Sequence, residues 1–298
     1  PLEKSLNMLN TLLPKVCRLK YVRRMALFAL ASLIMGCGGG SGSSSSTDAS
    51  NASSGSSSTT SPPQLLPGAY VASLFDKDWV GMLLPTKTGT STTYQFLGLH
   101  YNGSDPDIYS ASSGVVSATT ALPLVYVYPN ISAVVRTGSG TLSQLSNNVV
   151  LASLVFPATG LELAKSIGVA ASPPNNYKYN TPASLSTVQG SWTGRLAYSV
   201  GFAENFAMSI SSAGAISTAM PFQQDCVLSN AKLAPNFDGT NLFSLNLSIP
   251  SATQCSLKGQ TLNGAAFVTA SPLAGKTQRL YLVGVTTDGK GISFKADR

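Results

Sequence analysis

Short runs in which apolar and polar residues alternate dominate the chain from Leu65 onward. Residues 206–210 alternate in this way, residues 211–214 offer a Ser-Ser-Ala-Gly turn, and Ala215-Ile216 restarts the run. Successive side chains of a strand point to opposite faces, so a period of two predicts a β-hairpin here.

The same pattern predicts further strands, at residues 94–99, 125–128, 132–136, 149–156, 242–249, 280–285 and 292–294. Residues 160–167 have the length of a brief helix, but the Leu161-Glu162-Leu163 alternation argues against it. The alternation therefore predicts an all-β body. Short strands spaced by about 8 to 12 residues are typical of a sandwich or a barrel, and alternation alone does not separate the two.

The sequence of the body contains an approximate internal repeat. Gly68-Ala-Tyr70 opens the first half, and Gly190-Ser-Trp192 opens the second about 122 residues later. In both places an aromatic residue can anchor the first strand in a core. The Pro- and Asn-rich stretch between the halves marks a connection. We therefore expect β lobe 1 at 65–172, a linker at 173–184 and β lobe 2 at 185–298; the alternative is one continuous β domain.

The N-terminal segment predicts export. Basic residues from Lys15 to Arg24 precede the apolar run from Met25 to Met35, which is too short to cross a bilayer. Ile34-Met35-Gly36-Cys37 then resembles the lipobox of bacterial lipoproteins. The resemblance implies a signal peptide over 1–37 and palmitate on Cys37; an ordinary secretory signal with a chance cysteine is the alternative.

The residues after Cys37 predict a tether and a location. Residues 38–64 are nearly all Ser, Gly, Thr, Ala and Asn, which cannot bury enough apolar surface to fold, so this stretch should be disordered. Gly38 stands where an aspartate typically retains enterobacterial lipoproteins at the inner membrane. We therefore expect a cell-envelope protein that is lipid-anchored in the outer membrane.

Charge placement argues against a nucleic-acid partner. The net charge of +7 is concentrated in the signal segment, since residues 1–37 carry six Lys and Arg against Glu3. The remaining 13 basic and 11 acidic residues nearly balance. A near-neutral body offers no electrostatic footprint for a phosphate backbone.

A set of spaced motifs resembles a widespread, uncharacterised type of proteobacterial lipoprotein with duplicated β lobes. The motifs lie at residues 179–194, 208–216, 226–229, 243–247, 255–259 and 280–282. The resemblance implies an envelope location and a β architecture, and it implies no chemistry. Asp225 stands where glycine is more common in this type, so the turn before Cys226 departs from it.

Two cysteines remain in the expected mature body, Cys226 and Cys255. In an oxidising compartment an even pair predicts a disulfide. Two free buried cysteines are the alternative. A redox-active pair is disfavoured because the sequence contains no Cys-x-x-Cys.

Catalytic candidates are scarce. His100 is the one histidine, and Ser104 and Asp105 follow it closely, but nearness in sequence does not establish a triad. Two aspartate pairs stand among turn-forming residues, where Asp bonds to local backbone, and two glutamates are separated along the chain. These residues are Asp76, Asp78, Asp105, Asp107, Glu162 and Glu204. No metal-ligand spacing and no cofactor motif is present, so we expect neither group.

Two functions are open at this point. The first is a non-catalytic envelope lipoprotein, a binding or structural β module whose partner is a protein, a glycan or a hydrophobic ligand. The second is a surface-anchored hydrolase that uses His100 or an aspartate pair. The scarcity of general acids and bases favours the first.

Overall fold

The computed structural model describes most of the chain beyond residue 65. The described residues are 66–74, 77–88, 90–102, 105–113, 119–127, 135–146, 149–156, 165–174, 177, 181–198, 201–221, 226–236, 240–251 and 256–298. All of them belong to one compact unit, Ser58–Arg298. The expected signal peptide at 1–37 and tether at 38–64 lie outside the described residues.

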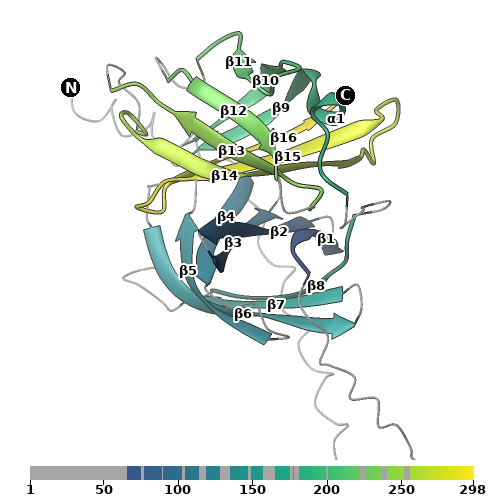
Figure 1. Cartoon of the computed structure of the whole chain (residues 1–298), viewed down its shortest axis with the longest axis vertical. Helices are drawn as coiled ribbons and strands as arrows, with labels where there is room; N and C mark the ends of the chain where they lie inside the picture. The colour runs from purple at the N-terminus through teal and green to yellow at the C-terminus, as the bar shows by residue number, and fades with distance from the viewer. Residues whose placement is uncertain are drawn as a thin grey trace, which may run out of the picture. The chain divides into compact units, whose positions relative to one another are not determined.

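The first half forms an eight-stranded antiparallel meander in which each strand pairs with its neighbours along the chain. Its strands are β1 (Gly68–Leu74), β2 (Lys77–Thr88), β3 (Ser91–Asn102), β4 (Asp105–Ser113), β5 (Thr119–Val127), β6 (Val135–Ser146), β7 (Val149–Phe156) and β8 (Lys165–Ala171). Val71 and Ser172 bridge the first and last strands, with N···O distances of 2.7 and 3.0 Å. This sheet therefore curls into a barrel, the first barrel (Figure 1).

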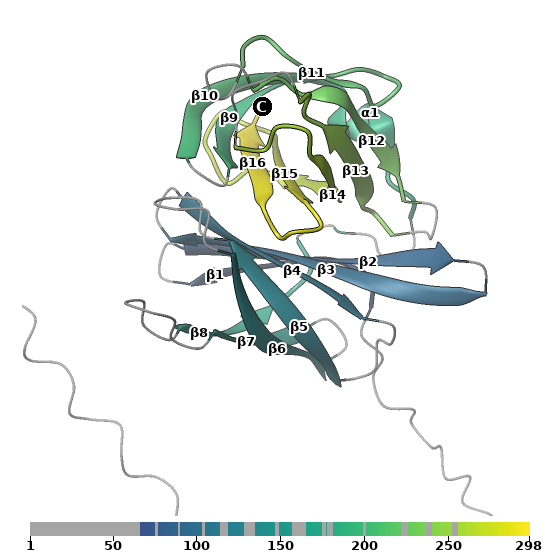
Figure 2. The same ribbon diagram turned by 90° about the vertical axis from the view of Figure 1, so that its left-hand side faces the viewer.

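The second half repeats this plan with the closure in another place. The four-residue helix α1 (Leu185–Val188) leads into β9 (Gly190–Tyr198), β10 (Gly201–Ile210), β11 (Ile216–Thr218), β12 (Ser229–Pro235), β13 (Phe243–Ser248), β14 (Thr261–Ala270), β15 (Gln278–Val285) and β16 (Gly291–Asp297). The last strand, β16, pairs with the first, β9. A bridge between Ala215 and Lys232 joins β11 to β12, so this sheet forms the second barrel (Figure 2).

Both barrels begin with the same anchor. Tyr70 and Trp192, each two residues after the first glycine of its barrel, are buried in the interior. The Tyr70 hydroxyl donates to the Leu66 carbonyl, and Trp192 Nε1 donates to the Val188 carbonyl at 2.7 Å, four residues upstream in each case. The outline repeat in the sequence therefore corresponds to a repeated local structure.

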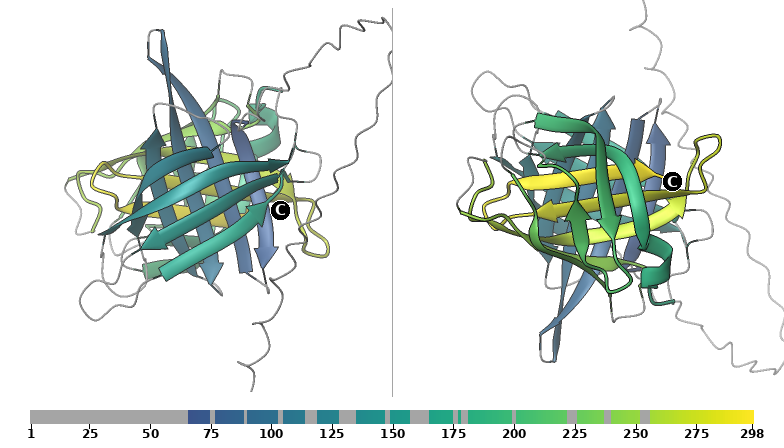
Figure 3. Two further views of the ribbon diagram at one scale, coloured as in Figure 1. Left: turned by 90° about the horizontal axis from the view of Figure 1, so that it is seen from below. Right: turned by 90° about the horizontal axis from the view of Figure 1, so that it is seen from above.

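Three apolar clusters hold the body together. One fills the second barrel around Trp192, Phe206 and Phe294, and another lies inside the first barrel around Trp79, Phe96 and Phe156. The third is made by the outer faces of both barrels. It joins Ala69, Val80, Met82, Leu84, Leu97, Leu99, Tyr101 and Ile108 to Leu242, Ala265, Phe267, Tyr281, Val283 and Val285. The strands of the two facing sheets run across one another at this junction (Figure 3).

The third cluster explains why β15 is apolar at every position from Leu280 to Val285. In β15, Leu280 and Leu282 belong to the interior cluster, while Tyr281 and Val283 belong to the cluster between the barrels. A strand that is buried on both faces has no solvent face for polar residues, so its alternation is lost.

The expected fold class is confirmed: the body is all-β and has two barrel-like lobes. The hairpins predicted at residues 206–216 and 280–294 are present as β10–β11 and β15–β16. The two sheets lie within the ranges expected for the two lobes, but they share a core and form one compact unit.

Candidate functional site

One row of residues crosses three strands of the first barrel. His100 on β3 pairs with Trp79 on β2 and with Asp107 on β4. Leu97 and Leu99 belong to the cluster between the barrels, whereas Phe96 belongs to the interior. Because side chains alternate along a strand, His100 lies on the interior face with Phe96, next to Trp79.

The Trp79 side chain is 1% exposed and lies in the interior cluster. Its ring stacks on Phe96, with the ring centroids 6.3 Å apart. A Cβ on Gly81 would lie 2.4 Å from the indole, so glycine is needed there for the ring to lie against the β2 backbone. The indole position is therefore fixed by its surroundings.

Among the described residues, the Trp79 N–H has no acceptor. No atom of the described residues accepts a hydrogen bond from Nε1, which is itself buried. Trp192, the second tryptophan of the chain, is equally buried and donates to Val188. Buried indole N–H groups usually find a partner, so the Trp79 N–H requires an explanation, as do other buried polar groups of the body such as the Thr240 hydroxyl.

His100 is half-buried and stands between a buried aromatic residue and an acidic position. The structure thus brings His100 and Asp107 into register, although the Asp107 side chain is not described. Ser104, the third member of a hypothetical triad, lies outside the described residues. The described part of the chain assembles no Ser-His-Asp geometry.

The interpretation of Asp105 and Asp107 as turn residues is wrong, since both belong to β4. The Asp-Pro-Asp sequence suggested a turn, but Pro106 is part of the strand. It lies in the second position of β4, where it pairs with Tyr101 of β3. Proline is tolerated at the start of a strand.

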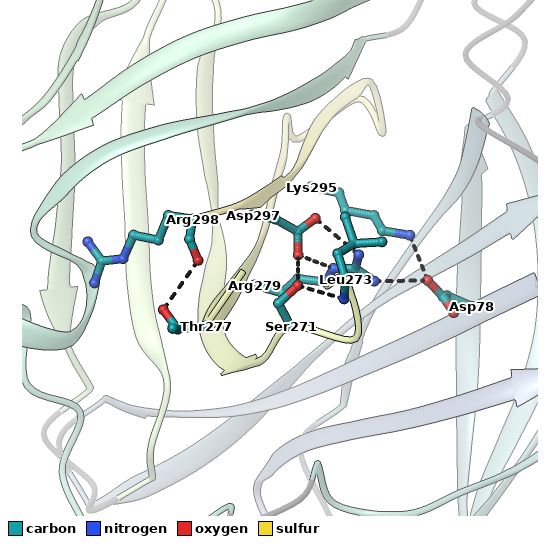
Figure 4. A network of polar contacts seen from close by, with 8 residues as sticks. All are labelled: Asp78, Ser271, Leu273, Thr277, Arg279, Lys295, Asp297 and Arg298. Carbon is teal, nitrogen blue, oxygen red and sulfur yellow. Dashed lines mark hydrogen bonds and ion pairs between the residues drawn. The ribbon is translucent and has the colours of Figure 1, made fainter. Parts of the chain in front are cut away.

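The turn interpretation is also wrong for Asp78, whereas Asp76 lies outside the described residues. Asp78 is the second residue of β2 and pairs with Ser73. Its carboxylate contacts the second barrel, where Lys295 Nζ lies 2.6 Å and Arg279 3.7 Å away (Figure 4). Asp78 is therefore part of a link between the two barrels.

The same polar cluster contains Asp297, which receives bonds from Arg279 Nε at 2.8 Å and from the Ser271 hydroxyl at 2.6 Å (Figure 4). Burial lowers the pKa of the Arg279 guanidinium, but the hydrogen bonds and charge interactions with Asp297 and Tyr281 together outweigh burial and raise the pKa above its ordinary value. Burial also raises the pKa of Tyr281 to about 12, and the charge of Asp78 adds to the effect. The charged groups of this cluster pair with one another, as is typical of a structural contact between two parts of a fold.

Of the two glutamates in the expected mature body, the structure describes Glu204. Glu204 is exposed on β10 and pairs with Arg195, whose guanidinium lies 3.9 Å over the Phe202 ring. Glu162 lies outside the described residues. Of the sulfur sites, Cys226 is fully buried in the second barrel, while Cys37 and Cys255 lie outside the described residues.

One arrangement has no signal in the sequence. Arg298 stacks over the Trp192 ring at 4.2 Å, and its guanidinium donates to Gln278 Oε1 and to the carbonyls of Thr187 and Gln189. It thereby binds the chain around α1 to the sheet. Arg298 lies about a hundred residues after α1, so local patterning could not reveal the contact.

Within the described ranges, no three His, Cys, Asp or Glu side chains gather as metal ligands would. The same residues include no helix with the length and apolar character to cross a bilayer. No protein-family model, curated protein or solved structure matches the chain.

Proposed function

We propose that the chain is a lipid-anchored protein of the bacterial cell envelope whose two-barrel body works by binding. The observation that carries this proposal is the Trp79–His100 pair on the interior face of the first barrel. An eight-stranded barrel is just wide enough to be filled by side chains or to hold one small ligand. The first barrel contains a buried donor without an acceptor among the described residues, as a site for a ligand would.

The anchor rests on Cys37 and the motif before it. A signal peptide over 1–37, an acylated Cys37 and a tether over 38–64 would hold the body near the outer membrane. Several acyl chains give stable anchoring, where one chain is marginal. Metabolic palmitate labelling of the expressed chain should be lost in Cys37→Ala; labelling that persists in this variant contradicts the anchor.

A disulfide between Cys226 and Cys255 would fit export. Cys226 is fully buried in the interior of the second barrel. Closing a loop of about 30 residues would stabilise the body by about 3 to 4 kcal/mol in the chain-entropy model. Mass analysis of non-reduced peptides should find Cys226 linked to Cys255. Alkylation of both thiols in denaturant without a reductant would show that the bridge is absent.

A hydrolase is the second candidate, because His100 and Asp107 stand opposite each other in the β3–β4 ladder. A histidine oriented by a carboxylate can act as a general base. Binding depends on Trp79 and hydrolysis would depend on His100. A substitution at each residue therefore tests the two functions separately.

The deciding experiment uses the body, residues 58–298, which contains every strand and all three clusters. It is screened for esterase, peptidase and glycosidase turnover. It is also incubated with a solvent extract of proteobacterial envelopes and examined by native mass spectrometry. We expect a bound species that Trp79→Phe weakens, and no turnover. Turnover that is lost in His100→Ala would overturn the proposal in favour of a hydrolase.

A further inference from the structure

Three methionines belong to the body, residues 58–298, and their exposure separates them into two groups. Met82 on β2 is 0% exposed in the cluster between the barrels, and Met208 on β10 is 4% exposed in the interior of the second barrel. Met220 is 67% exposed, more than any other large hydrophobic side chain of the described residues. A reagent in solution can therefore reach the sulfur atom of Met220 in the folded body, whereas the other two sulfur atoms are covered.

Met220 lies in a surface segment outside the strands of the second barrel. β11 ends at Thr218, and the three residues that follow, Ala219, Met220 and Pro221, are all exposed. Surface connections of this kind are accessible to enzymes as well as to small molecules. The position thus admits both a small oxidant and an enzyme that acts on the modified side chain.

The chemistry of the thioether gives this exposure a consequence. The methionine sulfur attacks one oxygen atom of hydrogen peroxide, and the O–O bond breaks as an S–O bond forms. The sulfur is oxidised to a sulfoxide, and the other oxygen leaves with both protons as water. No base or second side chain takes part, so the accessibility of the sulfur decides which methionine reacts.

We propose that Met220 is a site of reversible oxidation, at which the body reduces a peroxide without losing its fold. The sulfoxide is polar, and at Met220 it stays in solvent. At Met82 or Met208 the same group would be buried among apolar side chains, which destabilises a fold. Methionine sulfoxide reductases convert the sulfoxide back to methionine; two thiols supply the electrons, become a disulfide and release the oxygen as water. This inference is independent of the binding function proposed above.

Peptide mapping of the body after treatment with hydrogen peroxide tests the site. In the folded body, Met220 should gain one oxygen atom at least about tenfold faster than Met82 and Met208. In concentrated urea all three sulfur atoms are accessible, and their rates should agree within about threefold. Equal rates in the folded body, or a preference for Met220 that persists in urea, would overturn the proposal, because neither result follows from exposure in the fold.

A matched pair of variants tests whether the fold tolerates the sulfoxide. Glutamine has a polar side chain of similar length, so Met220→Gln should keep the urea midpoint of the parent body. Met208→Gln should lower the midpoint, because it buries the amide in the cluster that contains Trp192. The peroxide-treated body should also keep its midpoint. A loss on treatment that is absent from Met220→Leu would contradict tolerance at this site.

Reversibility is tested with the two methionine sulfoxide reductases, one for each sulfoxide epimer, and dithiothreitol as the thiol. Together they should remove the added oxygen from Met220 in the folded, treated body. Dithiothreitol without the enzymes is the control and should leave the sulfoxide in place. Sulfoxide that persists at Met220 after both enzymes have acted would show that the oxidation is not reversible in the folded protein.

Discussion

Lys295 Nζ lies 2.6 Å from Asp78 Oδ2, although the two residues are 217 positions apart and belong to different barrels. The ammonium group also lies 4.5 Å from the centre of the Tyr101 ring, above the third apolar cluster. The Lys295 ammonium group therefore contacts both the Asp78 carboxylate and the face of the Tyr101 ring. The pair closes the polar side of the joint between the barrels.

Asp78→Asn should lower the free energy of unfolding by about 1 to 2 kcal/mol, because it leaves Lys295 and Arg279 partly desolvated without this carboxylate. The side chains of Asp78 and Lys295 are 31% and 24% exposed, which places the expected loss between that of a surface pair and that of a buried pair. Urea unfolding of the body measures it. Glu204→Gln is the control, since Glu204 is 52% exposed and should cost less than about 1 kcal/mol. Equal losses in the two variants would show that the Asp78 contact between the barrels contributes no more than an exposed ion pair.

Arg298→Ala should destabilise the body by about 2 kcal/mol, through lost hydrogen bonds to the chain around α1 and a lost contact with Trp192. Thermal and urea unfolding measure the loss, and Trp192 fluorescence reports the local change. Lys276→Ala, at an exposed site of the β14–β15 connection, is the matched control and should stay within about 0.5 kcal/mol of the parent. A neutral Arg298→Ala would mean that α1 is held by its apolar contacts alone.

Two glycine substitutions should have opposite effects. A Cβ at Gly264 on β14 would lie 1.8 Å from the Val283 carbonyl oxygen of β15. Gly264→Ala must therefore push neighbouring strands apart, at a cost of about 3 kcal/mol or more. Gly168 on β8 has no heavy atom within 4 Å of such a Cβ, and Gly168→Ala should be neutral or stabilise by up to about 1 kcal/mol. Comparable unfolding curves for the two variants would contradict the strand spacing described here.

The stability of the body should fall as the pH rises from about 10 to about 12. Burial, with the charge of Asp78, raises the pKa of Tyr281 from 10.0 to about 12, so the folded chain keeps a proton that the unfolded chain releases first. Unfolding in this window therefore releases a proton, and the free energy of unfolding decreases with pH. Tyr281→Phe keeps the ring and should make the decrease shallower by about one proton. If the pH dependence of the free energy of unfolding is the same in Tyr281→Phe, a group other than Tyr281 titrates in this range.

The fold class could be predicted because its signal is local. Residues 206–216 alternate and then turn, and this pattern alone specifies the β10–β11 hairpin. The pattern could not distinguish a barrel from a sandwich, because closure depends on contacts such as Val71 with Ser172 and Ala215 with Lys232. No local pattern encodes which strand meets the first one.

The candidate site could be predicted only in part. His100 attracted attention as the one histidine, and Asp107 as one of a pair, but their opposition in the ladder depends on a register that the sequence does not contain. Trp79 gave no signal, because a tryptophan beside an aspartate looks like an ordinary strand residue. Its difference from Trp192 lies in whether a carbonyl is within reach of the indole, and this is decided by the fold.

The apolar face shared by the barrels also has a consequence for biosynthesis. Val80, Leu97 and Leu99 of the first barrel are covered by Phe267, Tyr281 and Val283, which are translated much later. A first half that folds as it emerges presents an uncovered hydrophobic surface until β14 and β15 arrive, and nascent chains with such surfaces associate with one another. The leading half therefore needs shielding until the trailing half reaches it.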